Sequence, residues 1–189
     1  MFQRYYRWAL IIGAAALIGT IIVADLVPTG RWHVATDFKK DSLWIRHLWP
    51  PGRVGEPVQL HNKVVIPITI EPVYVDVLTP RSFESVKARI TFAAEPSVPV
   101  SIGVARERNV WGGVFSPLTQ TQESKSSSWI GTAALSLHGI DQTHGRLQWI
   151  LSAKGLDPVH PLLITSIDLV FVRPTLYQWV IAHTKQLWK

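Results

Sequence analysis

The chain has 189 residues, no cysteine and a formal net charge of +6 at neutral pH. The absence of cysteine excludes disulfides, thiol catalysis and thiolate metal sites. Lysine and arginine are scattered rather than clustered, so the positive charge does not indicate nucleic-acid binding. It indicates only attraction to an anionic membrane surface or to an acidic partner.

The first predicted element is an apolar stretch at residues 8–27, WALIIGAAALIGTIIVADLV, whose one charge, Asp25, lies near its end. A helix of this length spans roughly 30 Å, the hydrocarbon thickness of a bilayer. Arg4 and Arg7 precede it, and positive charge on a short flank favours keeping that flank in the cytoplasm. The sequence therefore predicts a single-pass inner-membrane helix, with residues 1–7 cytoplasmic and the bulk of the chain periplasmic.

A cleaved signal peptide is the alternative, because Ile22-Val23-Ala24 resembles the small-residue cleavage site of a signal peptide, with Asp25 as the next residue. The apolar run is longer than a usual signal core, which favours an uncleaved anchor.

Two pairs of small residues follow small-xxx-small spacing in this helix, Ala15 with Gly19 and Ala16 with Thr20. Such pairs let transmembrane helices approach closely, which indicates packing against neighbouring membrane subunits. The alternative is that alanine and glycine are simply common in membrane helices. Aromatic rings expected at the membrane interface, among lipid headgroups, are Tyr5, Tyr6, Trp8, Trp44 and Trp49.

Residues 28–57 are predicted to be a connector, opened by the helix-breaking Pro28-Thr29-Gly30. A short helical pattern occurs at residues 37–49, with Asp41 or Ser42 as N-cap and a proline pair after it. Just outside a bilayer, this helix would lie in the interface with its tryptophans half immersed. The alternative is that these tryptophans pack on the following domain.

From residue 58 onward the apolar residues recur with period two, which predicts strands. Pro67 confines its strand to an edge or a bulge, and residues 129–137 indicate a strand covered on both faces. A polar surface loop is expected at residues 120–128. The eight predicted strands are at residues 64–70, 72–79, 86–92, 98–104, 110–115, 129–137, 147–151 and 162–172. No helical pattern recurs between them, so we predict a mainly β fold, an antiparallel sandwich or jelly roll at residues 58–174.

Residues 175–189 form a short amphipathic pattern that predicts a C-terminal helix. Its tryptophans, Trp179 and Trp188, are candidates for contact with a partner or a headgroup layer. The alternative is that this helix covers one open end of the sandwich.

Several segments resemble a pattern found in uncharacterised bacterial single-pass membrane proteins with exported β-sandwich modules. The segments are Gly52 to Pro57, Glu71 to Val77, Thr79 to Glu84, Trp149 to Leu156 and Ile164 to Arg173. The resemblance implies fold and topology only and carries over no catalytic residue. A weaker likeness, of pattern alone, is to galactose-binding-type jelly rolls.

The sequence contains no recognisable catalytic constellation, and we expect neither an enzyme nor a cofactor. None of its histidines stands in a metal-ligand spacing such as HExxH. His138 and His144, with Asp141 between them, are the best metal candidate, but a solvated loop is favoured and no metal site is predicted. Glu71 and Asp76 could serve glycoside hydrolysis as a carboxylate pair, yet their odd spacing puts them on opposite faces of a strand.

Nine tryptophans suit either of two functions. Exposed rings could stack on sugars beside a few polar groups, or they could lie at a bilayer interface and at protein contacts. Because Trp8, Trp44, Trp49, Trp179 and Trp188 lie in the predicted anchor, connector and terminal helix, we predict a non-enzymatic accessory subunit that braces a larger membrane complex, such as a respiratory or photosynthetic one. The alternative is a membrane-anchored module that binds carbohydrate or the cell envelope.

Overall fold

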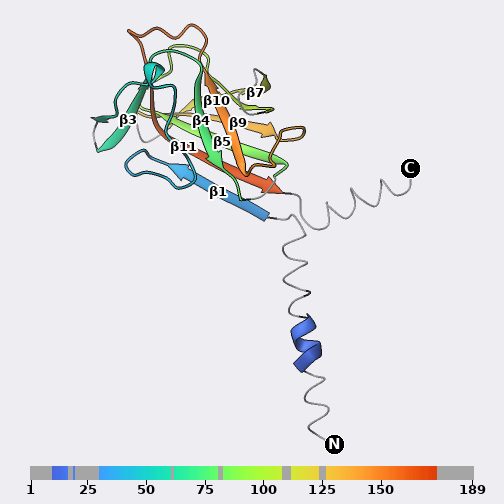
Figure 1. The fold of residues 1–189 in the computed structure, drawn as a ribbon. Coiled ribbons are helices and arrows are strands. Elements are labelled where there is room, and N and C mark those ends of the chain that lie inside the picture. The colour runs from blue at the N-terminus through green and yellow to red at the C-terminus, as the bar shows by residue number, and fades with distance from the viewer. Residues whose placement is uncertain are drawn as a thin grey trace, which may run out of the picture. The chain divides into compact units, whose positions relative to one another are not determined.

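The computed structural model describes residues 10–16, 19, 30–60, 62–80, 83–107, 112–123 and 127–173. The chain divides into two compact units, Met1–Gly30 with Arg173–Lys189, and Arg31–Val172. In the first unit, residues 10–16 and residue 19 are helical (Figure 1). Among the residues described, no helix is long and apolar enough to cross a membrane.

Most of the predicted anchor lies outside the described residues, as do the flank at residues 1–7 and the C-terminal helix at residues 175–189. The membrane span, its orientation and the C-terminal helix therefore stay predictions. Of the residues proposed for these roles, those outside the described part of the chain are Tyr5, Tyr6, Trp8, Thr20, Trp179 and Trp188.

Eleven strands of the described residues form two sheets (Figure 1). Sheet A has the order β2-β3-β11-β5-β9-β8, with β1 also paired to β11; sheet B has the order β4-β10-β6-β7. The strands of sheet A are β1 (Gly30–Thr36), β2 (Val58–Leu60), β3 (Lys63–Ile68), β5 (Ser85–Phe92), β8 (Thr119–Gln122), β9 (Trp129–Ser136) and β11 (Leu162–Arg173). Those of sheet B are β4 (Val73–Leu78), β6 (Ser101–Ala105), β7 (Gly113–Pro117) and β10 (Arg146–Ser152).

The two sheets pack face to face around one apolar core. Alternation along β5 buries every second side chain while Lys87 and Arg89 between them stay exposed, as a half-exposed strand requires. Sheet B contributes Trp149, whose ring meets that of Phe171 from β11 edge-on at 6.2 Å. The fold is thus a mainly β sandwich whose chain alternates between sheets from β3 to β6, an arrangement of the jelly-roll kind.

The helix predicted at residues 37–49 is absent, and this prediction was wrong. The segment runs beside β4 instead: the Arg46 N–H donates to the Asp76 carbonyl at 2.9 Å, and Trp49 and Tyr74 exchange backbone hydrogen bonds at 2.8 and 3.0 Å. An open sheet edge offers unpaired backbone groups, and pairing with them outweighs a short isolated helix. Ile45 is buried by this docking.

Three further differences concern strands. The sandwich begins earlier than predicted, because β1 lies in the stretch interpreted as connector. The strand β8 begins one residue before the predicted polar loop and occupies its first three residues. The sequence of β8, TQTQ, has no apolar residue and therefore no period-two signal. Residues of β9 were expected to be covered on both faces, but Thr132, Ala134 and Ser136 are exposed. Small side chains there leave one face of the sheet low and open.

Replacing Phe171 by alanine tests the core. Its ring is fully buried against Trp149 and against Phe83, whose ring centroid lies 5.0 Å away. We expect Phe171→Ala to lower the free energy of unfolding by about 3–5 kcal/mol, measured by urea denaturation. The control Phe115→Ala removes a ring that is 48% exposed and should cost much less. Equal losses in both variants would contradict the assigned core.

Candidate functional site

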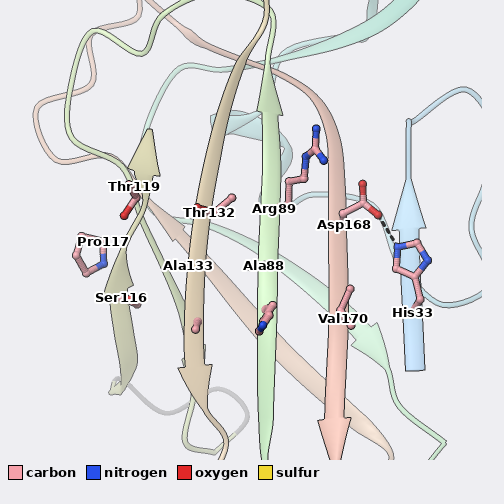
Figure 2. Close-up of a pocket in the computed structure, with 12 residues that line it drawn as sticks. His33, Ala88, Arg89, Ser116, Pro117, Thr119, Thr132, Ala133, Asp168 and Val170 are labelled. Atoms are coloured by element: carbon pink, nitrogen blue, oxygen red, sulfur yellow. Dashed lines mark hydrogen bonds and ion pairs between the residues drawn. The ribbon is translucent and has the colours of Figure 1, made fainter. Parts of the chain in front are cut away.

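The outward face of sheet A carries hydrogen-bonding side chains at one register across five neighbouring strands. Asp168 of β11 pairs with Arg89 of β5, Arg89 pairs with Thr132 of β9, and Thr132 pairs with Thr119 of β8. His33 of β1 joins the other end, its Nε2 lying 2.6 Å from Asp168 Oδ1. Figure 2 shows these five side chains across the sheet. We call them the polar row.

A groove of about 710 Å³ follows the polar row. Its floor includes the small side chains Thr132 and Ala134 of β9, and Lys87 pairs with Ala134 in the next register position. Ser116 and Pro117 lie beside Thr119 on one side, with His33 on the other (Figure 2). The groove is therefore a wide shelf on the sheet and not an enclosed cavity.

Apart from the pair of His33 with Asp168, the charges along the groove are solvated and loosely held. Arg89 lies 3.8 Å from a carboxylate oxygen of Glu123, with both side chains about half exposed. The side chain of Lys87 makes no hydrogen bond or ion pair with any residue that the structure describes. Exposed pairs of this kind contribute little to stability, so these groups remain available to a ligand.

The outward face of sheet B is different, because it carries aromatic rings. Trp49 stacks on Tyr74 with ring centroids 4.7 Å apart, and Tyr74 pairs with Ile150 in the ladder of β4 with β10. Ile150 pairs with Gly103, and Gly103 pairs with Phe115 of β7. A Cβ on Gly103 would lie 2.5 Å from the Phe115 ring, so glycine is what lets that ring lie against the sheet. Trp49, Tyr74 and Phe115 form the aromatic row.

The residues predicted for membrane roles are only partly placed. Trp44 is 43% exposed, and its ring meets Trp32 edge-on at 5.2 Å; Trp49 is 36% exposed on Tyr74. Both rings thus pack on the sandwich while keeping an exposed side, and lipid contact stays a prediction for them. Ala15, Ala16 and Gly19 lie in the helical residues of the first unit, and their proposed packing role also stays a prediction.

The two carboxylates considered for hydrolysis do not share a site. Glu71 accepts hydrogen bonds from the Ser152 hydroxyl at 2.5 Å and from the Ala153 N–H at 2.7 Å, which joins the start of β4 to the end of β10. Asp76 is buried, with its carboxylate 3.6 Å from the Arg146 guanidinium. Both groups therefore have local structural partners.

The loop considered for a metal is held by its own hydrogen bonds. The Thr143 hydroxyl and N–H donate to Asp141 Oδ1 at 2.7 and 2.9 Å. These bonds, the hydroxyl foremost, lower the pKa of Asp141 because they favour its ionised form, and His144 adds a smaller attraction. In the described residues, no group of three or more His, Cys, Asp or Glu could hold a metal ion.

The polar row was missed from the sequence. His33 fell in the presumed connector and Thr119 beside the presumed loop, and nothing local links either one to Asp168. One signal was present: Thr165, Ser166 and Asp168 interrupt the apolar run of β11, and of these Ser166 and Asp168 are partly exposed. A carboxylate in the middle of a long apolar strand marks a face that meets water or a ligand.

Comparisons with known proteins give a limited result. No protein-family model and no curated protein matches the chain. Among solved structures, it is similar to the xylan-binding module CBM15 at 13% identity and TM-score 0.45, covering 77% of this chain and 100% of that module. It is also similar to CBM35 from Cellvibrio japonicus Abf62 at 12% identity and TM-score 0.46, covering 76% and 99%.

A third similar structure is BtGH115A, a GH115 4-O-methyl-α-glucuronidase described as specific for decorated arabinogalactans, at 10% identity and TM-score 0.41. The match covers 72% of this chain and only 18% of that enzyme. At such identities and TM-scores, the likenesses establish neither a shared ligand nor a shared activity.

Thr143→Val tests the loop. The variant should raise the pKa of Asp141 toward its ordinary value, because the hydroxyl bond to the carboxylate is lost, and a carboxyl ¹³C NMR titration would measure it. The sign follows from the lowered pKa: the stabilisation is present above the ordinary aspartate pKa and is lost as pH falls through the lower folded value. Thr121→Val is the matched control, and an unchanged Asp141 pKa in Thr143→Val would refute the assignment.

Proposed function

We propose that the sandwich is a non-catalytic carbohydrate-binding domain and that the polar row is its binding surface. The observation that carries the proposal is the single register of His33, Asp168, Arg89, Thr132 and Thr119. Arg89 donates hydrogen bonds, the Asp168 carboxylate accepts them, and the threonine hydroxyls do both. Sugar hydroxyls also donate and accept, so each can find a partner along the row.

The dimensions of the row suit an oligosaccharide better than a single sugar. Five strands at a spacing of about 4.8 Å place its ends roughly 19 Å apart. The groove beside it is open along this length, and its floor is kept low by Thr132 and Ala134. A linear chain of sugar rings could therefore lie across the strands.

The composition of the groove favours a polar polymer over a protein partner. The centres of protein interfaces are enriched in aromatic side chains and depleted of lysine. Among the described residues, the groove lining includes Lys87 and has no phenylalanine, tyrosine or tryptophan. The stacking rings that we expected of a sugar site lie instead in the aromatic row of sheet B, so the groove would bind mainly through hydrogen bonds.

The proposal predicts a specific loss of binding in Arg89→Ala. Affinity electrophoresis of the full-length chain against soluble xylan, β-1,4-galactan, arabinogalactan and pectin would measure it. Hydrogen bonds from a charged group contribute roughly 1.5–3 kcal/mol, so affinity for the bound polymer should fall at least about tenfold. Arg46→Ala, which removes an exposed arginine outside the groove, is the matched control.

Two results would refute the proposal. One is a wild-type chain that binds none of the polysaccharides, and the other is an Arg89→Ala variant that binds as tightly as Arg46→Ala.

We further propose that the domain is held at the inner membrane by residues 8–27 and faces the periplasm. Support comes from the apolar run and from Arg4 and Arg7 before it. An accessory role in a membrane complex is compatible with this anchor, and it rests on Ala15 and Gly19 as a packing pair.

Topology and assembly can be measured together. Protease treatment of spheroplasts should remove an epitope placed after Lys189, since the C-terminus is expected outside the cytoplasm. Gentle detergent extraction should then show whether stoichiometric subunits co-migrate. A protected epitope would contradict the orientation, and a chain that migrates alone would contradict the accessory role.

A further inference from the structure

A second pocket, of about 320 Å³, lies away from the groove and shares no lining residue with it. Arg146 and Gln148 reach it from β10, and Asp141 and His144 reach it from the loop before that strand. Its volume is at the small end of the range for ligand sites, roughly 300–1,000 Å³. It is large enough for one small ring and too small for a chain of rings.

Gln148 is the unusual residue of this pocket. Only 7% of it is exposed, and its amide nitrogen is buried without a hydrogen-bond partner. A buried polar group without a partner destabilises a fold, and an apolar side chain of similar size would serve the strand better. The terminal torsion of a glutamine turns easily, so either its N–H or its carbonyl oxygen can face a ligand in the pocket. We therefore interpret Gln148 as a residue whose side-chain amide binds a ligand in this pocket.

The charged side chains around the pocket favour a neutral ligand with hydroxyl groups over an anion or a cation. Asp141 Oδ1 is occupied by Thr143, while Arg146 is held 3.6 Å from the buried carboxylate of Asp76. A ligand anion would approach two carboxylates, and a ligand cation would approach Arg146. A hydroxyl group avoids both penalties, because it can accept from Arg146 or Gln148 and donate to Asp141.

An apolar surface continues from the pocket along sheet B. Ile150 lies two residues beyond Gln148 on the same outward face of β10, and its register partner Gly103 is covered by the Phe115 ring. Phe115 is 48% exposed whereas Ile150 is buried, so the Phe115 ring supplies the exposed part of this surface. A ligand with hydroxyls at its edge and C–H groups on its face would meet both surfaces, and a sugar ring has this character.

We infer that the pocket formed by Asp141, His144, Arg146 and Gln148 binds one terminal sugar ring of a saccharide. We call it the sugar-end pocket. The inference shares its ligand class with the proposed function but does not use the groove, so the two can fail separately.

NMR titration of the ¹⁵N-labelled full-length chain with D-galactose, D-xylose, D-glucose and L-arabinose tests the inference. At least one sugar should shift the Gln148 side-chain amide and the backbone amides of residues 141–146 at millimolar concentration. Gln148→Leu should weaken that binding about tenfold or more, because one buried hydrogen bond is lost. The same variant should raise the melting temperature by a few degrees, since the unpartnered amide is removed.

Three further variants separate binding in the sugar-end pocket from binding in the groove and from a general effect of substitution. Gln59→Leu makes the same chemical change at an exposed position of β2 and should leave sugar binding unchanged. His144→Ala alters an exposed residue of the pocket rim, so it should fold normally and still weaken binding. Arg89→Ala should leave monosaccharide shifts at Gln148 intact, even where it abolishes binding of polysaccharide by the groove.

The inference is overturned if none of the sugars shifts the Gln148 amide, or if Gln148→Leu and His144→Ala bind as tightly as the wild type. Retained shifts at Gln148 in a chain that binds no polysaccharide would support the pocket while refuting the groove. A chain that binds polysaccharide but shows no sugar-induced shift at Gln148 would support the groove while refuting the sugar-end pocket.

Discussion

The register of β5 between β11 and β9 is the constraint on which both the core and the polar row depend. Ile90 faces inward while Arg89, one residue earlier, faces outward between Asp168 and Thr132. A slip by one residue would put arginine into the core and isoleucine on the surface. The apolar positions that bury this strand therefore also align the outward side chains of three strands, so one set of contacts supplies both stability and a binding surface.

The two outward faces of the sandwich offer different chemistry. Sheet A presents hydrogen-bonding groups on a shelf, whereas sheet B presents aromatic rings beside a small polar pocket. Residues 44–49 pair with the edge of β4, bring Trp49 onto Tyr74, and extend sheet B by an extra stretch of paired backbone.

The sequence predicted those strands in which apolar and polar residues alternate along the chain. The alternation of Val86, Lys87, Ala88 and Arg89 identified β5 and its exposed face, and β11 was expected as the last and longest strand. Where the local pattern is weak or conflicts with a tertiary contact, prediction failed. Residues 37–49 have helical spacing, but the edge of β4 binds them as extended chain.

The site could not be assembled from the sequence, because its members meet only through pairing of distant strands. His33 and Asp168 are 135 residues apart and join through the pairing of β1 with β11. Gln148 likewise lies within a predicted strand, residues 147–151, and the sequence did not single it out as a site residue. Gln148 is only 7% exposed although it lies on the outward face of β10, and no spacing within β10 reveals this burial. What the sequence could indicate was Asp168, a carboxylate within an apolar strand.

The polar row is tested most directly by an NMR map of the sandwich with an oligosaccharide cut from whichever polysaccharide the chain binds. We predict that the largest amide shifts follow the polar row, at Arg89, Thr132 and Asp168 on adjacent strands of sheet A. Shifts confined to β4 and β7, with sheet A unchanged, would contradict the assignment of sheet A as the binding surface.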